Sequence, residues 1–339
     1  MGRPKQTEIR VVRASTVRHL TAHFEALGAT VPRLLSGAGI SAELLEVPGT
    51  LVPVDRVFRF LELTCGDLGT EHPGLQLGLS SSLPDFGAYG RRLLASPTVG
   101  AYIEAGIRLY CCLNSGERFW LSAGSEGELR INFKSSGNHP LGAHQSHLCT
   151  LIMTILTIRR AAGPGWCPRE MGLAYRSREP LPQVEPLVGT TIICGTDHSY
   201  ITVPSALLQK GFPDLAEQRV RAADTTITPL PIDMLDILAN QIDTFTSAGG
   251  APRIDQVAES LSISRRTLQR EIAGRGRTFG EILRERRLRR ACEWLDHSEK
   301  SVTEIAFELG YTDASNFTRA FRREIGISPS AFRRQALSA

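Results

Sequence analysis

The chain has 339 residues, of which 42% are hydrophobic and 22% charged, and its formal net charge is +4. The length exceeds the usual size of one hydrophobic core and the composition excludes a disordered chain, so two folded domains are expected. The charge is uneven, because residues 253–334 hold 17 Arg and Lys against 12 Asp and Glu. This positive excess favours an anionic partner for the C-terminal part.

Targeting and membrane signals are weak in this sequence. The first residues, MGRPKQTEIRVVRAS, are basic but lack the apolar run that a secretory signal requires. The most apolar stretch, residues 148–158, is too short to cross a bilayer and is expected to form a buried helix. The seven cysteines contain no C-x-x-C pair, which is typical of reduced thiols. We therefore expect a cytoplasmic protein without membrane contact.

Residues 1–225 mix two kinds of apolar pattern. Residues 57–68 and 99–113 carry apolar residues three and four positions apart, as amphipathic helices do. Residues 118–123, 128–134 and 190–204 alternate or are rich in β-branched residues, as strands are. The expected fold is an α+β domain whose helices pack on a small sheet. The domain contains no phosphate loop, no G-x-S-x-G elbow and no H-E-x-x-H motif, so no enzyme class is indicated.

A group of histidines within this domain allows a metal-site alternative. His144 and His147 are three residues apart, with His139 and Cys149 nearby, and could face one side of a helix. No carboxylate or second cysteine completes a ligand set at the usual spacing. A metal-responsive protein that uses His144 and His147 is therefore an alternative, and no cofactor is expected.

The domain boundary is predicted at a polar stretch. Residues 221–231, RAADTTITPLP, have little apolar content and two prolines, which is typical of a linker. The two predicted domains are therefore residues 1–225 and 226–339. In the second domain the strand signals vanish, and the first helix should present a stripe of Ile232, Leu235, Leu238, Ile242 and Phe245.

An internal repeat organises the second domain. Residues 257–272 align with residues 305–321 at an offset of 48, with one extra residue in the second copy. The paired positions are Val257 with Ile305, Ala258 with Ala306, Leu261 with Leu309, Ser262 with Gly310, Leu268 with Phe317, Arg270 with Arg319, and Ile272 with Phe321. Each copy reads as helix, tight turn, helix, with a small residue where two backbones approach each other. The sequence therefore predicts an all-α domain with two helix-turn-helix units.

Turn and cap residues support the same division. Such a turn requires a residue with positive φ. Gly310 can adopt this conformation without strain, whereas Ser262 adopts it less easily than a glycine does. Ser301 followed by Glu304 forms a capping box, while Ser264 and either Thr312 or Asp313 can cap the second helix of each unit.

The exposed faces of the two second helices are candidate DNA-binding surfaces. If the paired apolar residues point inward, polar side chains point outward, and Arg and Gln are suited to base edges in a major groove. The candidate DNA-binding residues are Ser264, Arg265, Arg266, Thr267, Gln269, Arg270, Ala314, Ser315, Asn316, Thr318, Arg319 and Arg322.

Between the repeats, residues 278–295 predict one long helix of about 27 Å. Such a rod can hold the two units one turn of DNA apart, so that both enter successive major grooves. Its arginines, Arg287 among them, have two open interpretations. They contact DNA phosphates, or they pair on the surface, as Glu285 with Arg289 and Arg289 with Glu293 could.

Residues Pro231 to Arg334, with SRRTLQRE, RERRLRRACEWL and IAFELGYTDASNFTRAFRREIGISPSAFRR, resemble the DNA-binding domain of the AraC/XylS family of bacterial transcription regulators. The resemblance implies base contacts from Arg266, Gln269 and Arg270 in the first unit, and from Ala314, Ser315 and Arg319 in the second. Ala314 and Ser315 are short, so the second helix is expected to hold the DNA backbone more than to read bases. The implied function is a transcription activator that binds promoter DNA and RNA polymerase as a homodimer, although repression fits the residues equally well.

Residues Val31 to Leu215 are similar to the arabinose-binding type of sensor domain, with stretches such as GAYGRRLLASPTVGAYIEAGIRLY and PLVGTTIICGTDHSYITVPSALL. This resemblance implies a small-molecule effector but does not establish that a sugar binds. A domain that serves only for dimerisation is the remaining alternative.

Overall fold

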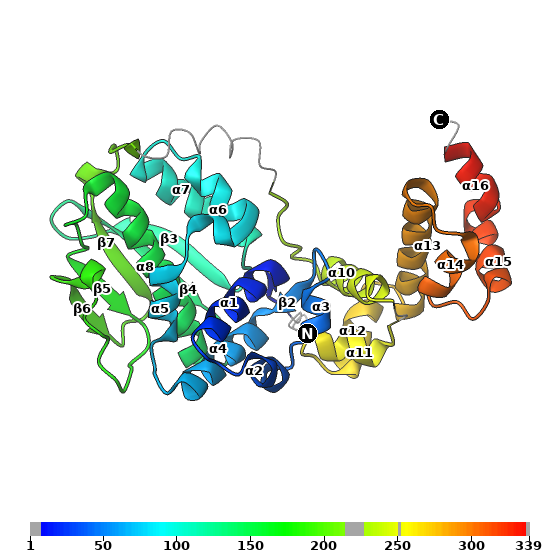
Figure 1. Ribbon diagram of the computed structural model, residues 1–339, viewed down its shortest axis with the longest axis horizontal. Helices are drawn as coiled ribbons and strands as arrows, with labels where there is room; N and C mark the ends of the chain where they lie inside the picture. Colours follow the sequence, from blue (N-terminus) through cyan, green and yellow to red (C-terminus); the bar gives the residue numbers. More distant parts are fainter. Residues whose placement is uncertain (1–7, 214–226, 250–251, 337–339) are drawn as a thin grey trace, which may run out of the picture. The chain divides into compact units, whose positions relative to one another are not determined.

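The computed structural model describes residues 8–213, 227–249 and 252–336, which form two compact units (Figure 1). The N-terminal unit consists of Arg10–Ser41 and Val52–Leu230, and the C-terminal unit holds Ala42–Leu51 and the described residues from Pro231 onwards. The expected boundary between residues 225 and 226 lies outside the described residues. A short segment from the first part of the sequence therefore belongs to the C-terminal unit.

The N-terminal unit is built on a five-stranded sheet with the strand order β3-β4-β7-β5-β6. Its strands are β3 (Glu117–Ala123), β4 (Glu128–Ser135), β5 (Glu170–Leu173), β6 (Thr191–Cys194) and β7 (Ser199–Pro204). The pairs β3–β4, β4–β7 and β5–β7 are antiparallel, and β5–β6 is parallel. Three predicted strand segments are thereby confirmed, and the last of them, residues 190–204, forms two strands. A separate two-stranded sheet pairs β1 (Val11–Arg13) with β2 (Leu51–Pro53).

Helices complete this unit, as the α+β prediction requires (Figure 1). They are α1 (Ala14–Ala26), α2 (Val31–Ala38), α4 (Val54–Leu68), α5 (Pro73–Ser80), α6 (Gly87–Leu94), α7 (Val99–Leu109) and α8 (Pro140–Ala162), with 3₁₀ turns at Leu83–Phe86, Tyr110–Cys112, Glu185–Leu187 and Ser205–Leu207. By length and composition α8 could cross a membrane, but 72% of its apolar window is buried inside the structure. The expectation of a buried helix at residues 148–158 is confirmed.

The crossing of α4 and α8 depends on a glycine in the first turn of α8. A Cβ atom on Gly142 would lie 1.8 Å from the carbonyl oxygen of Phe58 on α4. No side chain can be accommodated there unless the two backbones move apart, because the obstacle is backbone rather than a flexible side chain. Gly142 therefore sets how closely α8 packs against α4.

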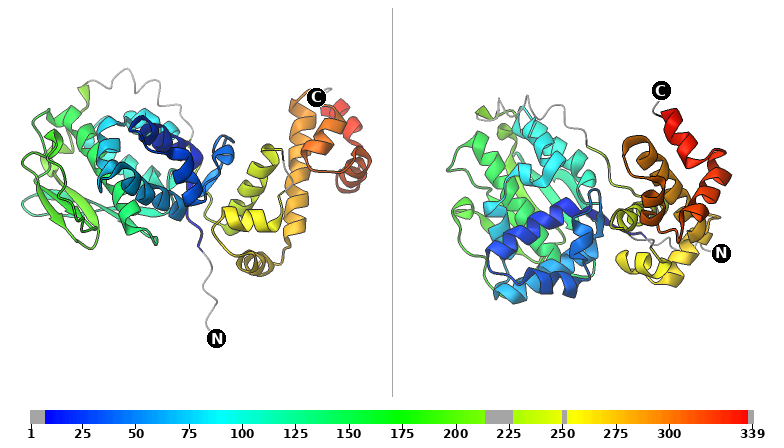
Figure 2. Two further views of the ribbon diagram at one scale, coloured as in Figure 1. Left: turned by 60° about the horizontal axis from the view of Figure 1, so that its bottom comes forward. Right: turned by 45° about the vertical axis from the view of Figure 1, so that its right-hand side comes forward.

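The regular secondary structure described in the C-terminal unit is helical, except at Leu51, which is the first residue of β2. Its helices are α3 (Ala42–Leu45), α10 (Met234–Ser247), α11 (Ile254–Ser260), α12 (Arg265–Ala273), α13 (Phe279–His297), α14 (Val302–Glu308), α15 (Ala314–Ile325) and α16 (Pro329–Ala336). Figure 2 shows α13 running from the group α10–α12 to the group α14–α16. Helices α11 and α12 form the first helix-turn-helix unit, and α14 and α15 form the second.

Each helix-turn-helix unit buries the residues that the repeat predicts. In the first unit Val257, Ala258, Leu261, Leu268 and Ile272 are at most 2% exposed. The corresponding residues of the second unit, Ile305, Ala306, Leu309, Phe317 and Phe321, are at most 1% exposed, and they form one cluster with Ala291 and Leu295 of α13. The prediction of two copies of one motif on a shared helix is confirmed.

The expected apolar stripe of the first helix was wrong at its start. Helix α10 begins at Met234 with Asp233 as its N-cap, so Ile232 lies before the helix and is 85% exposed. The buried face instead includes Ile237 and Gln241. The Asp233 carboxylate accepts a hydrogen bond from the backbone of Leu235, which fixes the helix start two residues later than the apolar spacing suggested.

The segment Ala42–Leu51 is held against α10 by side-chain amides. The Asn240 amide donates to the carbonyl of Gly49 at 3.0 Å, and the Gln241 amide donates to the carbonyl of Leu51 at 2.8 Å. Gln241 also accepts a hydrogen bond from the Ser260 hydroxyl of α11 at 2.9 Å and is only 2% exposed. Gln241 thus joins this segment to the first helix-turn-helix unit.

We predict that Gly142→Ala lowers the free energy of unfolding by about 1–3 kcal/mol or more, because the added methyl group forces α4 and α8 apart. The matched control is Gly66→Ala on α4, where a Cβ would meet nothing within 4 Å. That change should stabilise the protein by about 0.5–1 kcal/mol through helix propensity. Urea unfolding followed by circular dichroism measures both, and equal effects of the two changes would contradict the close approach.

Candidate nucleic-acid interface

The first candidate recognition helix, α12, begins at a serine cap. The Ser264 hydroxyl accepts a hydrogen bond from the backbone N–H of Thr267 at 3.0 Å, as predicted for a helix start. Because Leu268 and Ile272 are buried, the opposite face carries exposed side chains. The exposed polar residues of this face are Ser264, Arg265, Arg266, Gln269 and Arg270, while Thr267 is half-buried.

The long side chains of α12 differ in how they are engaged. Arg265 pairs with Asp255 of α11 at 3.3 Å, and Arg270 lies 3.5 Å from the buried carboxylate of Glu271. Arg266 and Gln269 have no hydrogen-bond or ion-pair partner within the described parts of the chain. These two side chains can therefore bind a partner without first giving up a contact.

The turn before each recognition helix has the backbone conformation that the repeat predicts. Ser262 has φ of 59° and Gly310 has φ of 75°, both in the left-handed region. Glycine adopts this conformation without steric cost, whereas an L-residue pays about 1–2 kcal/mol. The predicted positive φ is confirmed at both turns.

The second candidate recognition helix, α15, has a connected polar face. Asp313, rather than Thr312, is its N-cap, and it accepts a hydrogen bond from the backbone N–H of Asn316 at 2.7 Å. The side-chain amide N–H of Asn316 donates to the Asp313 carboxylate at 2.5 Å, and the Arg319 guanidinium donates to the side-chain Oδ1 of Asn316 at 2.6 Å. The sequence left Thr312 and Asp313 as alternative caps, and the structure selects Asp313. The chain of side-chain contacts from Asp313 through Asn316 to Arg319 was not predicted from the sequence.

The remaining candidates on α15 are short or unengaged. Ser315 is exposed, and Ala314 and Thr318 are half-buried. Arg322 is exposed and has no partner within the described residues. The second helix therefore offers fewer free long side chains near its N-terminus than the first.

Helix α13 uses several of its arginines to hold the C-terminal unit together. The guanidinium of Arg286 donates to the carboxylate of Asp243 on α10, with one hydrogen bond of 2.9 Å, and this contact raises its pKa. Arg290 donates to the Ser247 hydroxyl at the end of α10 at 3.2 Å and lies 4.9 Å above the ring of Trp294. The contacts with Asp243 and Ser247 fix the rod to α10.

Arg287, one of the arginines predicted to contact DNA phosphates, makes a contact within the protein. It is half-buried, its guanidinium lies 5.5 Å from the ring centroid of Tyr311, and burial lowers its pKa. Tyr311 in turn packs against Phe317 of α15. Arg287 thus holds α13 to the second unit through a cation–π contact, and spacing along α13 alone could not show this partner.

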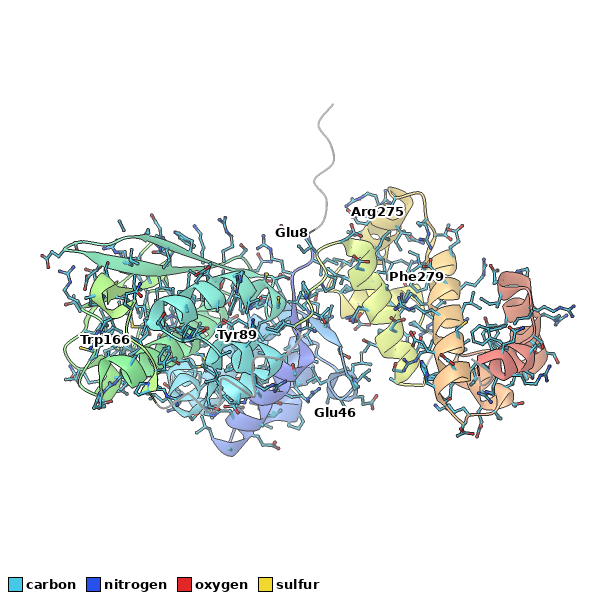
Figure 3. The ribbon with its side chains drawn as sticks, turned by 90° about the horizontal axis from the view of Figure 1, so that it is seen from above. Glu8, Glu46, Tyr89, Trp166, Arg275 and Phe279 are labelled. Carbon is cyan, nitrogen blue, oxygen red and sulfur yellow. The ribbon has the colours of Figure 1, made fainter. Side chains whose placement is uncertain are left out.

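The surface-pairing interpretation of the α13 arginines is confirmed in part. Arg289 pairs with Glu293 at 3.4 Å, as the four-residue spacing predicts. Glu285 pairs with Arg277 at 2.6 Å and not with Arg289. Arg277 belongs to the connection between α12 and α13, in which Figure 3 labels Arg275 and the first residue of α13, Phe279. Exposed pairs of this kind contribute little to stability.

The histidine group of the N-terminal unit does not form a metal site. Both ring nitrogens of His147 contact hydroxyl groups, those of Ser135 at 2.7 Å and Ser199 at 2.8 Å. His144 is 2% exposed, and burial lowers its pKa to about 3. Within the described residues no group of three or more His, Cys, Asp or Glu side chains could hold a metal ion. The metal-responsive alternative that relied on His144 and His147 has no ligand set.

The N-terminal unit contains a cavity of about 100 Å³. Its wall comes from α1, α4, α5, α6, α7, α8 and strands β1, β3 and β4 of this unit. Aromatic side chains form one side, where Tyr110, Phe119 and Phe133 contact one another in sequence at centroid distances of 4.0 and 3.8 Å. A small, mostly apolar cavity with a few polar groups is typical of a small-molecule site. No signal in the sequence indicated its lining.

Two helix-turn-helix units on one rod, joined to an α+β unit with an internal cavity, define the class of modular DNA-binding regulators. Residues 257–335 match the family described as a helix-turn-helix domain. Residues 28–212 match the arabinose-binding N-terminal domain of AraC transcription regulators, which is more than half of the chain. The chain belongs to the AraC family: it is a DNA-binding transcription regulator and not an enzyme.

Several proteins are similar to this chain. The ornithine utilization regulator of Pseudomonas aeruginosa is 24% identical over 339 residues, which cover 96% of each chain. The transcriptional activator RhaS of Escherichia coli is 44% identical over 80 residues, which are 23% of this chain and 29% of that protein. The crystal structure of the transcriptional regulator CdpR from Pseudomonas aeruginosa is 19% identical, with a TM-score of 0.39, over 94% of this chain and 98% of that one.

We predict that Arg287→Ala lowers the free energy of unfolding by about 0.5–2 kcal/mol, because it removes a partly desolvated cation–π contact. It should leave the salt dependence of DNA binding unchanged. The control Arg289→Ala removes an exposed ion pair and should change stability by less than about 0.5 kcal/mol. Urea unfolding and DNA titrations at several salt concentrations test both. A salt slope that falls by about one for Arg287→Ala, with stability unchanged, would restore the phosphate role.

Proposed function

We propose that this regulator reads bases mainly through α12 and uses α15 mainly to fix its register on the DNA backbone. The observation that carries this proposal is the contrast between the two helices. On α12, Arg266 and Gln269 are exposed and have no partner within the described residues. On α15, Asn316 and Arg319 are already hydrogen-bonded to each other. Arg can bind guanine and Gln can bind adenine in two-point contacts, so α12 has the better side chains for base recognition.

The rod supports binding on one face of the duplex. Helix α13 has 19 residues, which corresponds to about 28 Å of length. One turn of DNA is about 34 Å, so two helices held near the ends of such a rod can enter successive major grooves. The remaining candidate residues of α12 and α15, including Ser264, Thr267 and Thr318, are assigned to the sugar-phosphate backbone or to the helix starts.

The cavity favours a sensor over a purely dimerising N-terminal unit. Val54, which lines the cavity, lies three residues after Leu51, whose carbonyl accepts the hydrogen bond from Gln241. A ligand that alters the cavity wall can therefore act, through a short covalent path, on a segment that is part of the C-terminal unit. A population shift between two arrangements of this segment would change DNA affinity.

The wider assignment follows from the family and from the named relatives. We assign the protein to promoter DNA in the cytoplasm, as a homodimer that activates transcription together with RNA polymerase. The likeness to an ornithine utilization regulator favours control of genes for the use of a small metabolite. Repression by the same contacts would require only a different position of the site relative to the promoter.

The DNA for this test is a duplex selected for its affinity for the wild-type protein. We predict that Arg266→Ala weakens binding to this duplex by about 1–3 kcal/mol and relaxes the preference at particular base pairs. Arg270→Ala should act in the same way, because Arg270 can contact a base once it leaves its ion pair with Glu271. On α15, Arg319→Ala should weaken all sequences alike, and Ser315→Ala should have an effect below about 0.5 kcal/mol.

The measurement is a competition titration of each variant against a panel of single-base-pair substitutions. Circular dichroism of each variant checks that the fold is intact. An Arg266→Ala variant that keeps the wild-type preference at every base pair would contradict the assignment of α12. An Arg319→Ala variant that loses preference at single base pairs would show that α15 reads bases too.

A further inference from the structure

The cavity of the N-terminal unit is uncharged. Within the described residues its lining contains no Asp, Glu, Lys, Arg or His side chain. A charged group buried there would lose its hydration without gaining an opposite charge, which costs far more than burying a neutral polar group. Figure 3 shows Tyr89, one of the lining residues, among the helices of this unit. The chemistry of the wall therefore selects against ions.

The nearest buried carboxylate is already fully engaged. Glu117 lies behind the lining residues Tyr110 and Asn114, and its side chain is 2% exposed. It accepts hydrogen bonds from the Tyr110 hydroxyl, from the Asn114 amide at 3.1 Å and from the Ser135 hydroxyl at 2.9 Å. It does not line the cavity, so it cannot serve as a free partner for an amine.

Hydroxyl groups of the lining, those of Thr16 and Tyr89 among them, have no hydrogen-bond partner within the described residues. Thr16 of α1 is 8% exposed, and its Oγ1 atom is buried without a hydrogen bond. The Tyr89 hydroxyl of α6 likewise has no hydrogen-bond partner within the described residues. Buried polar atoms are nearly always hydrogen-bonded in folded proteins, so the unsatisfied Oγ1 atom of Thr16 indicates a missing partner, and the half-buried Tyr89 lines the same cavity. The structure leaves these two hydroxyls available to a bound molecule.

Two other polar side chains of the wall, Gln145 and Asn114, are hydrogen-bonded within the protein. The Gln145 side chain accepts from the backbone N–H of Gly74 at 3.0 Å and donates to the carbonyl of Glu71 at 2.9 Å. The Asn114 side chain accepts from the backbone N–H of Gly116 at 2.8 Å. Burial raises the pKa of Tyr89 well above its usual value, so its hydroxyl stays neutral. Only neutral hydroxyl groups that can both donate and accept are therefore left unpaired.

We propose that this cavity binds a small, uncharged and largely apolar molecule, of about the size of one ring, that carries a hydroxyl or carbonyl group hydrogen-bonded by Thr16 and Tyr89. The volume of about 100 Å³ supports the size, since an apolar cavity of about 150 Å³ takes up benzene. This inference rests on the proposed sensor function and adds the chemical class of the effector. It makes Thr16 and Tyr89 the residues that set specificity.

The test uses four probes of one shape that differ only in polarity: 4-fluorobenzyl alcohol, 4-fluorotoluene, 4-fluorobenzoate and 4-fluorobenzylamine. Their ¹⁹F signals are titrated with the full-length protein. We expect the alcohol and the toluene to bind, and both ions to bind at least tenfold more weakly than the alcohol. Tyr89→Phe and Thr16→Val should each weaken the alcohol about threefold to tenfold and leave the toluene unchanged, because each removes one neutral hydrogen bond.

Matched controls remove the same atoms outside the cavity. Thr21→Val lies on α1 and Tyr175→Phe follows β5, and neither residue lines the cavity. Both should bind all probes as the wild type does. Equal or tighter binding of an ion, no binding of the alcohol, or an alcohol affinity unchanged in both Tyr89→Phe and Thr16→Val would overturn the inference.

DNA affinity measured with and without saturating alcohol separates this inference from the proposed function. If the alcohol binds as expected but DNA affinity does not change, the ligand class stands and the sensor function fails. If an ion binds preferentially and changes DNA affinity, the sensor function stands and the ligand class fails.

Discussion

The C-terminal unit depends on how the middle of α13 is fixed to its neighbours. Arg286 and Arg290 hold the rod to α10, and Arg287 holds it to Tyr311 of the second helix-turn-helix unit. Beneath these contacts, Ala291 and Leu295 complete the apolar core of the second unit. A single helix is stiff over this length, so the separation of the two recognition helices is set by the contacts that α13 makes with α10 and with the second unit. The arginines of α13 therefore act first by fixing the arrangement of the helices within the C-terminal unit.

That constraint explains why the two recognition helices can differ. Once the rod fixes their separation, one helix can supply most of the base recognition and the other can hold the backbone. The side chains follow this division, because Arg266 and Gln269 are free within the described residues while Asp313, Asn316 and Arg319 form a connected chain. Phosphate contacts supply affinity without sequence information, so a preorganised α15 still contributes to binding.

Much of this architecture was predictable because it is local. The repeat, the caps at Ser264 and Ser301 and the turn at Gly310 follow from short-range spacing and from backbone preferences. The partners of Arg286, Arg287 and Gln241 could not be predicted, since each contact joins segments far apart in the sequence. The start of α10 was misplaced because the Asp233 cap outweighs the apolar character of Ile232. The cavity lining is equally non-local, with contributions from residues between Val12 and Thr154.

The central claim is that one rigid rod presents two unequal readers to one face of the duplex. Selection of bound duplexes from a fully randomised pool, followed by sequencing, tests it most directly. The account predicts two clusters of preferred base pairs about 10 base pairs apart, with the stronger preference in the cluster that Arg266→Ala removes. A single cluster, a separation that is not one helical turn, or a stronger cluster that Arg266→Ala leaves intact would contradict it.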